Sequence, residues 1–539
     1  MKAATVLLVA ACAVFAQTKQ PDLCVPPPSG TAPALPAKIL SGQGTVHFPI
    51  TTSNPKAQEF FDQGVAQMHS FRSTEAERSF LQAAELDPEA PMPYWGIAMV
   101  AAGDYRPRFQ IDTFDKMFGK GSSRGAPARA VEAAKKADQL AKAPGKATDL
   151  EKLYIASIVA RRDANSKSPD EGYIQGLRAI VAQYPDEVEA KTYLALHLMR
   201  GFELPDHTPR STTMESVGIL RDLLVKAPNH PGVHHYVIHG FEGSTFAKDA
   251  WPSCKRYAEL VPNIPHALHM PGHIYAQTGR WDDAVTSFSS AADNERGYMK
   301  ADRLYGTGHH GHNVHFLATS YSFEGQYDKA KEAARELLGF KENPREQASV
   351  DGFFSAHRQG WFAMMRALVQ SESWDEILDG KTLPVYDKPR EQAWRHWAMA
   401  LAYAGKGNVA QAKAEAKLME DSLSEYKEKV KMPVPEVLET ARVEVEGQVR
   451  LAEGKIDGAL KKLEEAAKLE LHMTYNEPPA YPRPVLEALG QAAFKNGKLP
   501  QAESAFRRAL EQYPGSHRAQ AGLRATLERE HKAVEAGGF

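Results

Sequence analysis

One spacing of residues recurs in this chain of 539 residues and limits its fold more than any other feature. Small and large apolar residues and a closing proline follow one another at fixed distances in residues 60–88, at Gly64, Ala76, Phe80, Ala83 and Pro88. The same distances return near the C-terminus, at Gly490, Ala502, Phe506, Ala509 and Pro514. Such a pattern indicates two packed helices, because small residues let helices approach and large ones fill the space between them.

This spacing resembles the tetratricopeptide repeat, a helical hairpin of about 34 residues. Further amphipathic helix pairs are legible between the two ends, over residues 149–184, 186–227, 230–262, 265–296, 312–340, 353–380 and 391–420. One hairpin cannot bury its apolar face alone, so neighbouring hairpins must stack. We therefore expect an all-α solenoid, a right-handed superhelix of nine or ten hairpins over residues 55–529, with insertions near 104–146, 201–213 and 296–311 and a tail at 530–539.

The N-terminus has a different character. Residues 1–16 contain one lysine and an apolar run that ends in small residues, the layout of a secretory signal peptide, so we expect cleavage after Ala16 and a periplasmic or secreted protein. Residues 9–12 also resemble a lipoprotein box, and the alternative is an exported protein with a lipid anchor at Cys12. The proline-rich residues 17–54 are predicted to form an extended arm.

The charge of the chain and its cysteines limit which classes of partner and which disulfide bonds we expect. With 65 basic and 67 acidic residues, the chain lacks the positive charge typical of nucleic-acid binding, so we expect no nucleic-acid partner. After residue 16, no apolar run approaches the length of about 18 residues that indicates a transmembrane span. Cys254 lies at a core-facing helix position, and both a free buried thiol and a bridge to Cys24 remain open.

Histidines recur with the period of the repeats. His235 and His269 are 34 residues apart, and so are His239 and His273. On the helix that begins at Pro265, the histidines form a stripe opposite the face of the expected core residues, since each residue turns the helix by about 100°. The stripe continues over three repeats and contains His235, His239, His266, His269, His273, His312 and His315, with Glu242 at its margin.

The stripe predicts a metal site. In tetratricopeptide repeats this face lines the concave groove, and stacked helices about 8–10 Å apart can share one ion. Imidazole ligands suit zinc, copper, iron or nickel, and we favour copper or zinc for an exported protein, with iron as a further candidate. Seven histidines exceed the three or four that one ion uses, so the stripe can hold one or two ions.

The histidine pattern leaves the activity open. A wide groove leaves coordination positions for a substrate, which would allow a metal-dependent oxidative or hydrolytic enzyme, with Glu242 as the candidate for proton transfer. The alternative is a metal-free scaffold that binds a peptide or protein partner in the groove. Whether the protein is an enzyme is not decided by these residues.

The remaining histidines are expected to have lesser roles. His234 and His396 occupy core positions and are predicted to be structural. His309 and His310 fall on an expected connecting loop, close enough in sequence to cap the site, and His69 has no histidine near it in the sequence pattern.

Longer motifs carry a more specific resemblance. The segments "HHYVIHGFE", "PHALHMPGHIYAQTGRWDDA" and "HNVHFL", with "YWGIAM" upstream and "NEPP" downstream, are similar to a family of bacterial tetratricopeptide-repeat proteins. The resemblance implies that the family's motif positions are His235, His239, Glu242, His266, His269, His273, His312, Asn313 and His315. The chain departs from the family pattern at His234 and at "GHHGHN", and the resemblance implies no activity.

Overall fold

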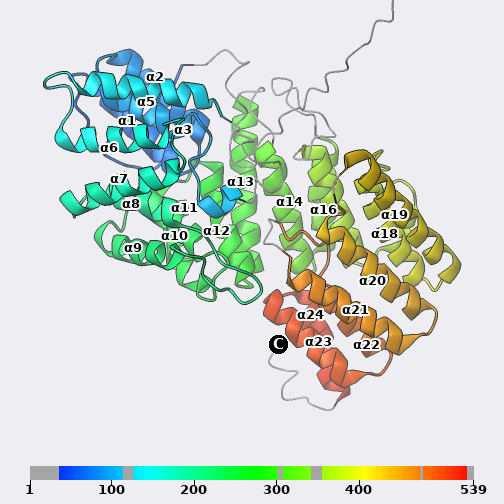
Figure 1. The fold of residues 1–539 in the computed structure, drawn as a ribbon. Helices are drawn as coiled ribbons and strands as arrows, with labels where there is room; N and C mark the ends of the chain where they lie inside the picture. Colours follow the sequence, from blue (N-terminus) through cyan, green and yellow to red (C-terminus); the bar gives the residue numbers. More distant parts are fainter. Residues whose placement is uncertain are drawn as a thin grey trace, which may run out of the picture.

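The computed structural model describes residues 36–112, 125–301, 308–340, 355–431, 433–473 and 478–530. Its helices stack side by side into two lobes that meet in the middle of the molecule (Figure 1). The N-terminal lobe contains α1 (Pro55–His69), α2 (Ser73–Leu86), α3 (Pro91–Val100), α5 (Pro127–Ala141), α6 (Asp149–Arg161), α7 (Pro169–Gln183), α8 (Val188–Leu198), α9 (Thr213–Lys226), α10 (Pro231–Phe241), η1 (Ala247–Ala250), α11 (Trp251–Leu260), α12 (Pro265–Gln277) and α13 (Trp281–Ala301).

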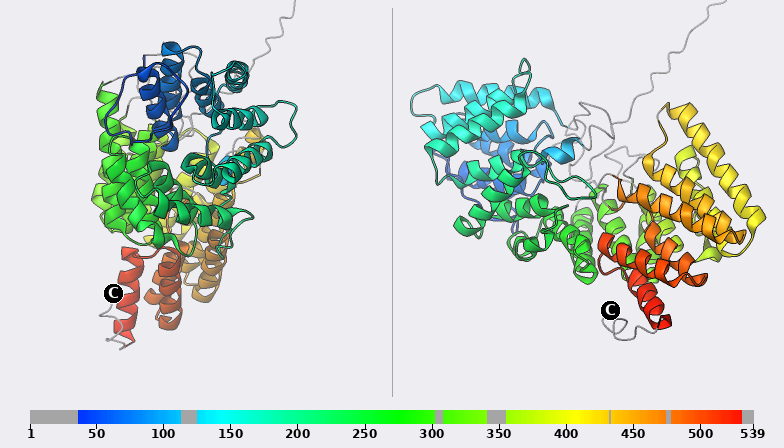
Figure 2. Two further views of the ribbon diagram at one scale, coloured as in Figure 1. Left: turned by 90° about the vertical axis from the view of Figure 1, so that its left-hand side faces the viewer. Right: turned by 60° about the horizontal axis from the view of Figure 1, so that its bottom comes forward.

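The C-terminal lobe continues the same stacking (Figure 2). It contains α14 (Gly308–Phe323), α15 (Tyr327–Leu338), α16 (Ala356–Gln370), α17 (Trp374–Leu378), α18 (Pro389–Gly405), α19 (Val409–Val430), α20 (Glu436–Ala452), α21 (Ile456–Leu471), α22 (Val485–Lys495), α23 (Leu499–Gln512) and α24 (His517–Arg529). Consecutive helices pack as hairpins, from α1 with α2 to α22 with α23, and α24 ends the stack. The predicted all-α repeat solenoid is confirmed.

The recurring spacing sets the distance between the two helices of a hairpin. A Cβ atom added to Gly64 of α1 would lie 2.5 Å from the ring of Phe80 in α2. Likewise, a Cβ atom on Gly272 of α12 would lie 2.5 Å from the ring of Phe288 in α13. Any larger residue would push the helices apart, so the glycine and the phenylalanine together fix the close packing that the sequence pattern indicated.

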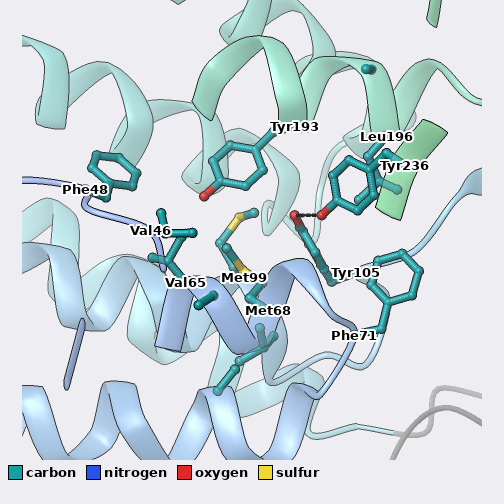
Figure 3. Packing of buried hydrophobic residues seen from close by; sticks show 14 of the residues in the cluster. Val46, Phe48, Val65, Met68, Phe71, Met99, Tyr105, Tyr193, Leu196 and Tyr236 are labelled. Carbon is teal, nitrogen blue, oxygen red and sulfur yellow. Dashed lines mark hydrogen bonds between the residues drawn. The ribbon is translucent and has the colours of Figure 1, made fainter. Parts of the chain in front are cut away.

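The N-terminal lobe closes on itself, since α1 contacts α10. The ring of His69, at the end of α1, hydrogen-bonds through Nδ1 to the hydroxyl of Tyr236 in α10 at 3.0 Å. The hydroxyl of Tyr105 lies 2.7 Å from that of Tyr236, and Figure 3 shows both rings inside the lobe beside Tyr193. The inner face of the first helices is therefore packed against α10 rather than open to solvent.

Residues 36–54, the described part of the expected arm, help to close this lobe. The segment contains no helix and lies against both the first and the later hairpins. Phe48 packs against Phe61 and Trp95, with ring centroids 5.7 Å away from each. Gln43 donates from Nε2 to the carbonyl of Asn263, between α11 and α12, at 2.6 Å.

The C-terminal lobe also closes. Arg518 in α24 donates to Glu372, just after α16, with 2.9 Å between Nη2 and Oε1. Arg366 in α16 donates from Nη1 to the carbonyl of Tyr481 at 3.0 Å. Hairpins far apart in the sequence thus become neighbours, and the interior of this lobe is filled as well.

The two lobes touch where two turns approach each other. Trp281, the first residue of α13, donates from its indole nitrogen to the carbonyl of Pro514 at 2.8 Å. Gly279 and Gly515 lie in these turns with φ of +79° and +73°, a left-handed conformation that glycine adopts without steric cost. A Cβ atom on Gly279 would lie 2.7 Å from the backbone of Pro514, so this contact depends on the absence of a side chain.

The structure changes some details of the expected domain organisation. The expected insertion at 104–146 includes α5, which packs on α3, and the insertion at 296–311 is shorter, since α13 extends to Ala301 and α14 begins at Gly308. Cys254 is a free, buried thiol. The signal peptide, Cys12, Cys24 and most of the C-terminal tail lie outside the described residues. Within the described part of the chain, no helix combines the length and the apolarity needed to cross a membrane.

Candidate metal centre

The histidine stripe lies on α10, α12 and α14, as the repeat period predicted, but it does not line an open groove. All seven histidines and Glu242 are buried, with at most 6% of each exposed. The closure of the N-terminal lobe is the cause, because it places other side chains over the face that would be concave in an open superhelix. The expectation of a wide groove at the histidines is therefore wrong.

Aromatic rings cover both ends of the cluster. Phe71, in the turn after α1, lies with its ring centroid 4.5 Å from that of His235 and 5.4 Å from that of His239. Phe316 of α14 lies 4.9 Å from the ring of His273 at the other end. Phe71 has a φ of +52°, which is uncommon for a bulky residue and is tolerated only where surrounding packing enforces it.

The first group of imidazoles joins α10 and α12. His235, His239 and His266 each offer one ring nitrogen, and these nitrogens all lie within 4.8 Å of one another. His235 Nδ1 lies 2.5 Å from the carbonyl oxygen of His69, which can only accept, so Nδ1 carries the proton. Its Nε2 then holds a lone pair, and it points at His266 Nε2 at 3.1 Å.

The second group joins α12 and α14. His269, His273 and His312 also offer ring nitrogens within 4.8 Å of one another. His273 Nδ1 donates to Oε1 of Glu242 at 2.7 Å, which leaves a lone pair on His273 Nε2. That nitrogen faces His269 Nε2 at 2.6 Å.

Each group has the same construction. It takes two histidines four residues apart on one helix and a third from an adjacent helix of the stack. In each, one histidine is held from behind by an oxygen acceptor, which fixes the tautomer and leaves the other ring nitrogen ready to bind a metal. We call these two groups the α10 triad and the α14 triad.

Two residues connect the triads. Glu242 hydrogen-bonds to His273 of the α14 triad, and its Oε2 lies 3.5 Å from Nδ1 of His239 in the α10 triad. The ring of His309 lies 5.9 Å from that of His266 and 5.6 Å from that of His269. The two triads thus form one continuous cluster.

Several ring nitrogens in this cluster are buried and have no hydrogen-bond partner among the described residues. They are His239 Nε2, His266 Nδ1, His269 Nδ1 and His312 Nδ1. Leaving one such group unsatisfied costs about 1–3 kcal/mol, so four of them in one cluster are a substantial penalty. A cation bound to Nε2 of His239 or to Nδ1 of His312 would offset part of that penalty, because neutral imidazole is a good metal ligand. In His266 and His269 the nitrogen that faces the neighbouring imidazole is Nε2, so an ion there would leave Nδ1 unpaired.

Burial also favours the protonation state that a metal requires. It lowers the pKa of His235, His266, His269 and His312 well below the ordinary value, and neighbouring histidines lower it further. The imidazoles are therefore neutral at pH 7, with lone pairs available. The pKa of His239 is lowered less, because Glu242 opposes the effect of burial.

The distances between nitrogens fit a shared ion. Two nitrogens bound to one ion at about 2.0–2.1 Å in a tetrahedral arrangement lie about 3.3 Å apart. The 3.1 Å between His235 and His266 is close to this value, and the 2.6 Å between His269 and His273 needs an opening of a few tenths of an ångström. The donor set, three imidazoles per triad, suits zinc, copper or iron.

Not every predicted ligand joins the cluster. His315 belongs to neither triad; its Nδ1 lies 2.5 Å from Oε1 of Gln359, and burial lowers its pKa to about 3. Asn313 lies next to the cluster rather than in it, with its Nδ2 3.1 Å from Nδ1 of His309. Glu242 orients histidines of both triads, which is a positioning role and does not itself make the carboxylate a proton-transfer group.

Two further histidines gain roles that the sequence pattern did not give. His309 lies in α14 rather than on a loop, and donates from Nδ1 to Glu295 at 2.8 Å. His69 supplies the carbonyl that holds His235. The sequence did not predict the contact between His309 and Glu295, because α13 and α14 are longer than expected. The contact of His69 arises only when the lobe closes.

In a third cluster, formed by His69, Glu189 and His230, every ring nitrogen has a hydrogen-bond partner. Glu189 accepts from His69 and His230, each at 2.8 Å, and these ring nitrogens lie within 4.8 Å of its carboxylate. Tyr236 and the backbone NH of Val233 bind the other ring nitrogens of the two histidines. His234 is likewise paired, with Ser253 and with the carbonyl of Pro228, as predicted for a structural residue.

Comparison with known proteins supports the repeat fold. Tetratricopeptide repeat family models match residues 313–344, 445–517 and 487–535. No curated protein sequence matches this chain. The histidine motifs and a bacterial origin, which the sequence resemblance implied, stay predictions.

Solved structures with some likeness include human IFIT1 with m7Gppp-AAAA, at 13% identity and a TM-score of 0.31, over 90% of this chain and 88% of that one. Yeast Tom70 has 12% identity and a TM-score of 0.33, over 88% of this chain and 96% of that one. Likeness at this level carries no conclusion about ligands or activity. The family models and the observed hairpins together show that the chain is a helical repeat protein that contains tetratricopeptide repeats.

Proposed function

We propose that the protein binds one or two transition-metal ions among the histidines of α10, α12 and α14, one ion at each triad. The observation that supports this most is the orientation of His235 and His273, each of which donates one NH to an oxygen and directs its other nitrogen at a second imidazole. Copper and zinc are the first candidates and iron the third, since all three accept imidazole ligands.

The burial of the cluster argues for an ion that is held rather than exchanged quickly. The triads lie beneath Phe71 and Phe316, so an ion would lose most of its water on entry and leave only when the packing opens. Glu242 would supply negative charge close to histidines of both triads. Binding of the second ion is favoured by the same carboxylate that orients the ligands of the first.

Metal analysis of the purified protein tests the proposal. After dialysis against a metal-free buffer, elemental analysis should find up to two equivalents of metal per chain, and His269→Ala with His273→Ala should lose the equivalent at the α14 triad. His234→Ala is the matched control, because His234 is buried beside His235 but belongs to neither triad. Unchanged metal content in the double variant, or equal loss in His234→Ala, would show that the triads are not the site.

Catalysis at the bound ion is a narrower proposal. Three protein ligands are the number typical of catalytic zinc sites, where the fourth position takes water or substrate, and each triad supplies three. The metal-loaded protein can be screened against redox dyes and against ester, amide and phosphate substrates. If any activity appears, Glu242→Gln should reduce it, because the amide cannot hold the histidine tautomers in the same way; a metal-saturated and inactive protein points to binding or storage.

The metal-free scaffold is the alternative. Tetratricopeptide arrays commonly bind partners on a concave surface, but the inner face that carries these histidines is filled by packing. A peptide or protein partner would therefore bind elsewhere on the chain. Export to the periplasm or beyond also remains a proposal, which N-terminal sequencing of the mature protein would test.

A further inference from the structure

A second site lies between the two lobes, beside the α14 triad but outside it. Its cavity has a volume of about 710 Å³, within the range of about 300–1,000 Å³ that is usual for small-molecule sites. One wall comes from α11, α12 and α14, and the opposite wall from α21, α22, α23 and the segment before α22. His273 is the only triad residue that lines it in the described part of the chain.

The cavity walls are rich in aromatic rings. Trp251, Trp281 and Phe316 line it from the N-terminal side and from α14, and Tyr481 and Tyr513 line it from the C-terminal lobe. Aromatic side chains on opposite walls offer faces and edges against which a flat ring can pack. The composition of the walls favours an aromatic ligand.

The interior of the cavity carries little net charge. Arg508 pairs with Glu464 through two contacts of 2.9 and 3.0 Å, and Lys248 and Glu511 are exposed at the rim. Burial raises the pKa of Glu470 to about 8, so at pH 7 this carboxyl is mainly protonated. A charged ligand would thus lose hydration without meeting an opposite charge, which disfavours ions.

Two polar atoms within the walls have no hydrogen-bond partner among the described residues, and neighbouring atoms cover each of them. Ser320 is 1% exposed, and its hydroxyl has no hydrogen-bond partner among the residues that the structure describes. The same holds for the side-chain oxygen of Gln512 within the described ranges. Both residues line the cavity, Ser320 from α14 and Gln512 from α23.

We propose that this cavity binds a small, uncharged aromatic molecule, which packs against the aromatic rings of its walls. The inference goes beyond metal binding, because the cavity and its walls do not depend on an ion. A ligand here would bridge the lobes and would lie against His273, a residue of the α14 triad.

Calorimetric titration of the full-length protein at pH 7 tests this with three probes of one ring system. These probes are 1-naphthol, which is neutral, 1-naphthoate, which is an anion, and 1-naphthylmethylammonium, which is a cation. We expect 1-naphthol to bind at least tenfold more tightly than either ion, in both chelator-treated and metal-loaded protein. Equal binding of all three probes, or binding of none, would overturn the proposal, whereas loss of metal alone would leave it standing.

Variants locate the binding. Ala276→Phe should fill part of the cavity and weaken the binding of 1-naphthol at least tenfold. Ala404→Phe is the matched control, because Ala404 is a half-buried helical alanine of α18 that does not line the cavity. If Ala276→Phe binds like the parent protein, the probe binds elsewhere and the assignment is wrong.

Discussion

The interiors of the two lobes are built alike and filled differently. Both are stacks of hairpins that close on themselves and bury the face that an open superhelix would expose. In the C-terminal lobe one buried carboxylate is fully paired: Glu444 contacts Arg483 at 2.6 Å and accepts from Trp397 at 3.1 Å. In the N-terminal lobe and the adjoining α14, the α10 and α14 triads contain ring nitrogens without hydrogen-bond partners in the described residues.

This difference separates a structural network from a ligand site. A paired interior needs nothing from outside, because each desolvated group has its partner. An interior of neutral imidazoles with unsatisfied nitrogens is incomplete as it stands, and an ion would satisfy some of these nitrogens. The cluster of His69, Glu189 and His230 supports this distinction within the N-terminal lobe itself, since its three members are held by hydrogen bonds and its geometry alone does not make it a site.

Breaking the paired interior should have the largest effect. Glu444→Ala leaves Arg483 buried without its main partner, and we expect a loss of about 3–5 kcal/mol in the free energy of unfolding. Urea denaturation followed by circular dichroism measures it. Glu439→Ala removes only a half-exposed pair with Arg442 and should change stability by less than about 1 kcal/mol; equal losses would refute the distinction.

Metal should stabilise the N-terminal interior and leave the C-terminal one unaffected. At a free concentration one hundred times the dissociation constant, binding adds about 2.7 kcal/mol to the free energy of unfolding. Chelator treatment should remove this gain, and His235→Ala should reduce it by removing one ligand of the α10 triad. In a folded Glu444→Ala variant, metal should add the same amount to the free energy of unfolding. If metal no longer stabilised this variant, the two lobes would not respond to metal independently.

The third test concerns the pH dependence of a buried carboxyl in the C-terminal lobe. Burial raises the pKa of Glu470 from 4.5 to about 8. Between these pH values the unfolded chain releases the proton and the folded chain keeps it, so stability falls as pH rises. Glu470→Gln should flatten this fall, and its free energy of unfolding should exceed that of the parent protein by a few kcal/mol above pH 8, with no gain at pH 4.

Urea denaturation from pH 4 to pH 9 checks the profile of Glu470→Gln. Glu465→Gln is its control, because Glu465 is half-exposed and pairs with Lys462. A parallel pH dependence in the parent protein and in Glu470→Gln would contradict the raised pKa.

The smallest effect is expected where a polar atom is already unsatisfied. His312→Leu removes a ring with an unpartnered Nδ1, so in chelator-treated protein we expect a change in stability of less than about 1 kcal/mol. In metal-loaded protein the same variant should lose part of the stabilisation by metal. A large loss without metal would show that His312 is structural, as the paired residues of the C-terminal lobe are.

The sequence determined the local architecture. The spacing of residues such as Gly64 and Phe80 predicted the hairpins, and the distance of 34 residues between His235 and His269 predicted that the histidines share one face of adjacent helices. Helical periodicity and repeat length are properties of short segments, so they can be read directly along the chain. The pairing of histidines four residues apart with a neighbour from the next helix followed from the same geometry.

Only the tertiary structure decided that this face is buried. Small rotations between hairpins add up along the stack and bring α1 against α10, which no single segment encodes. That closure places Phe71 over the cluster and brings the carbonyl of His69 to His235. The lengths of α13 and α14 place His309 beside the cluster, whereas His315 contacts Gln359 instead. The sequence thus determined which residues face inward, and the closure of each lobe decided which of them meet, because meeting depends on contacts between hairpins far apart in the chain.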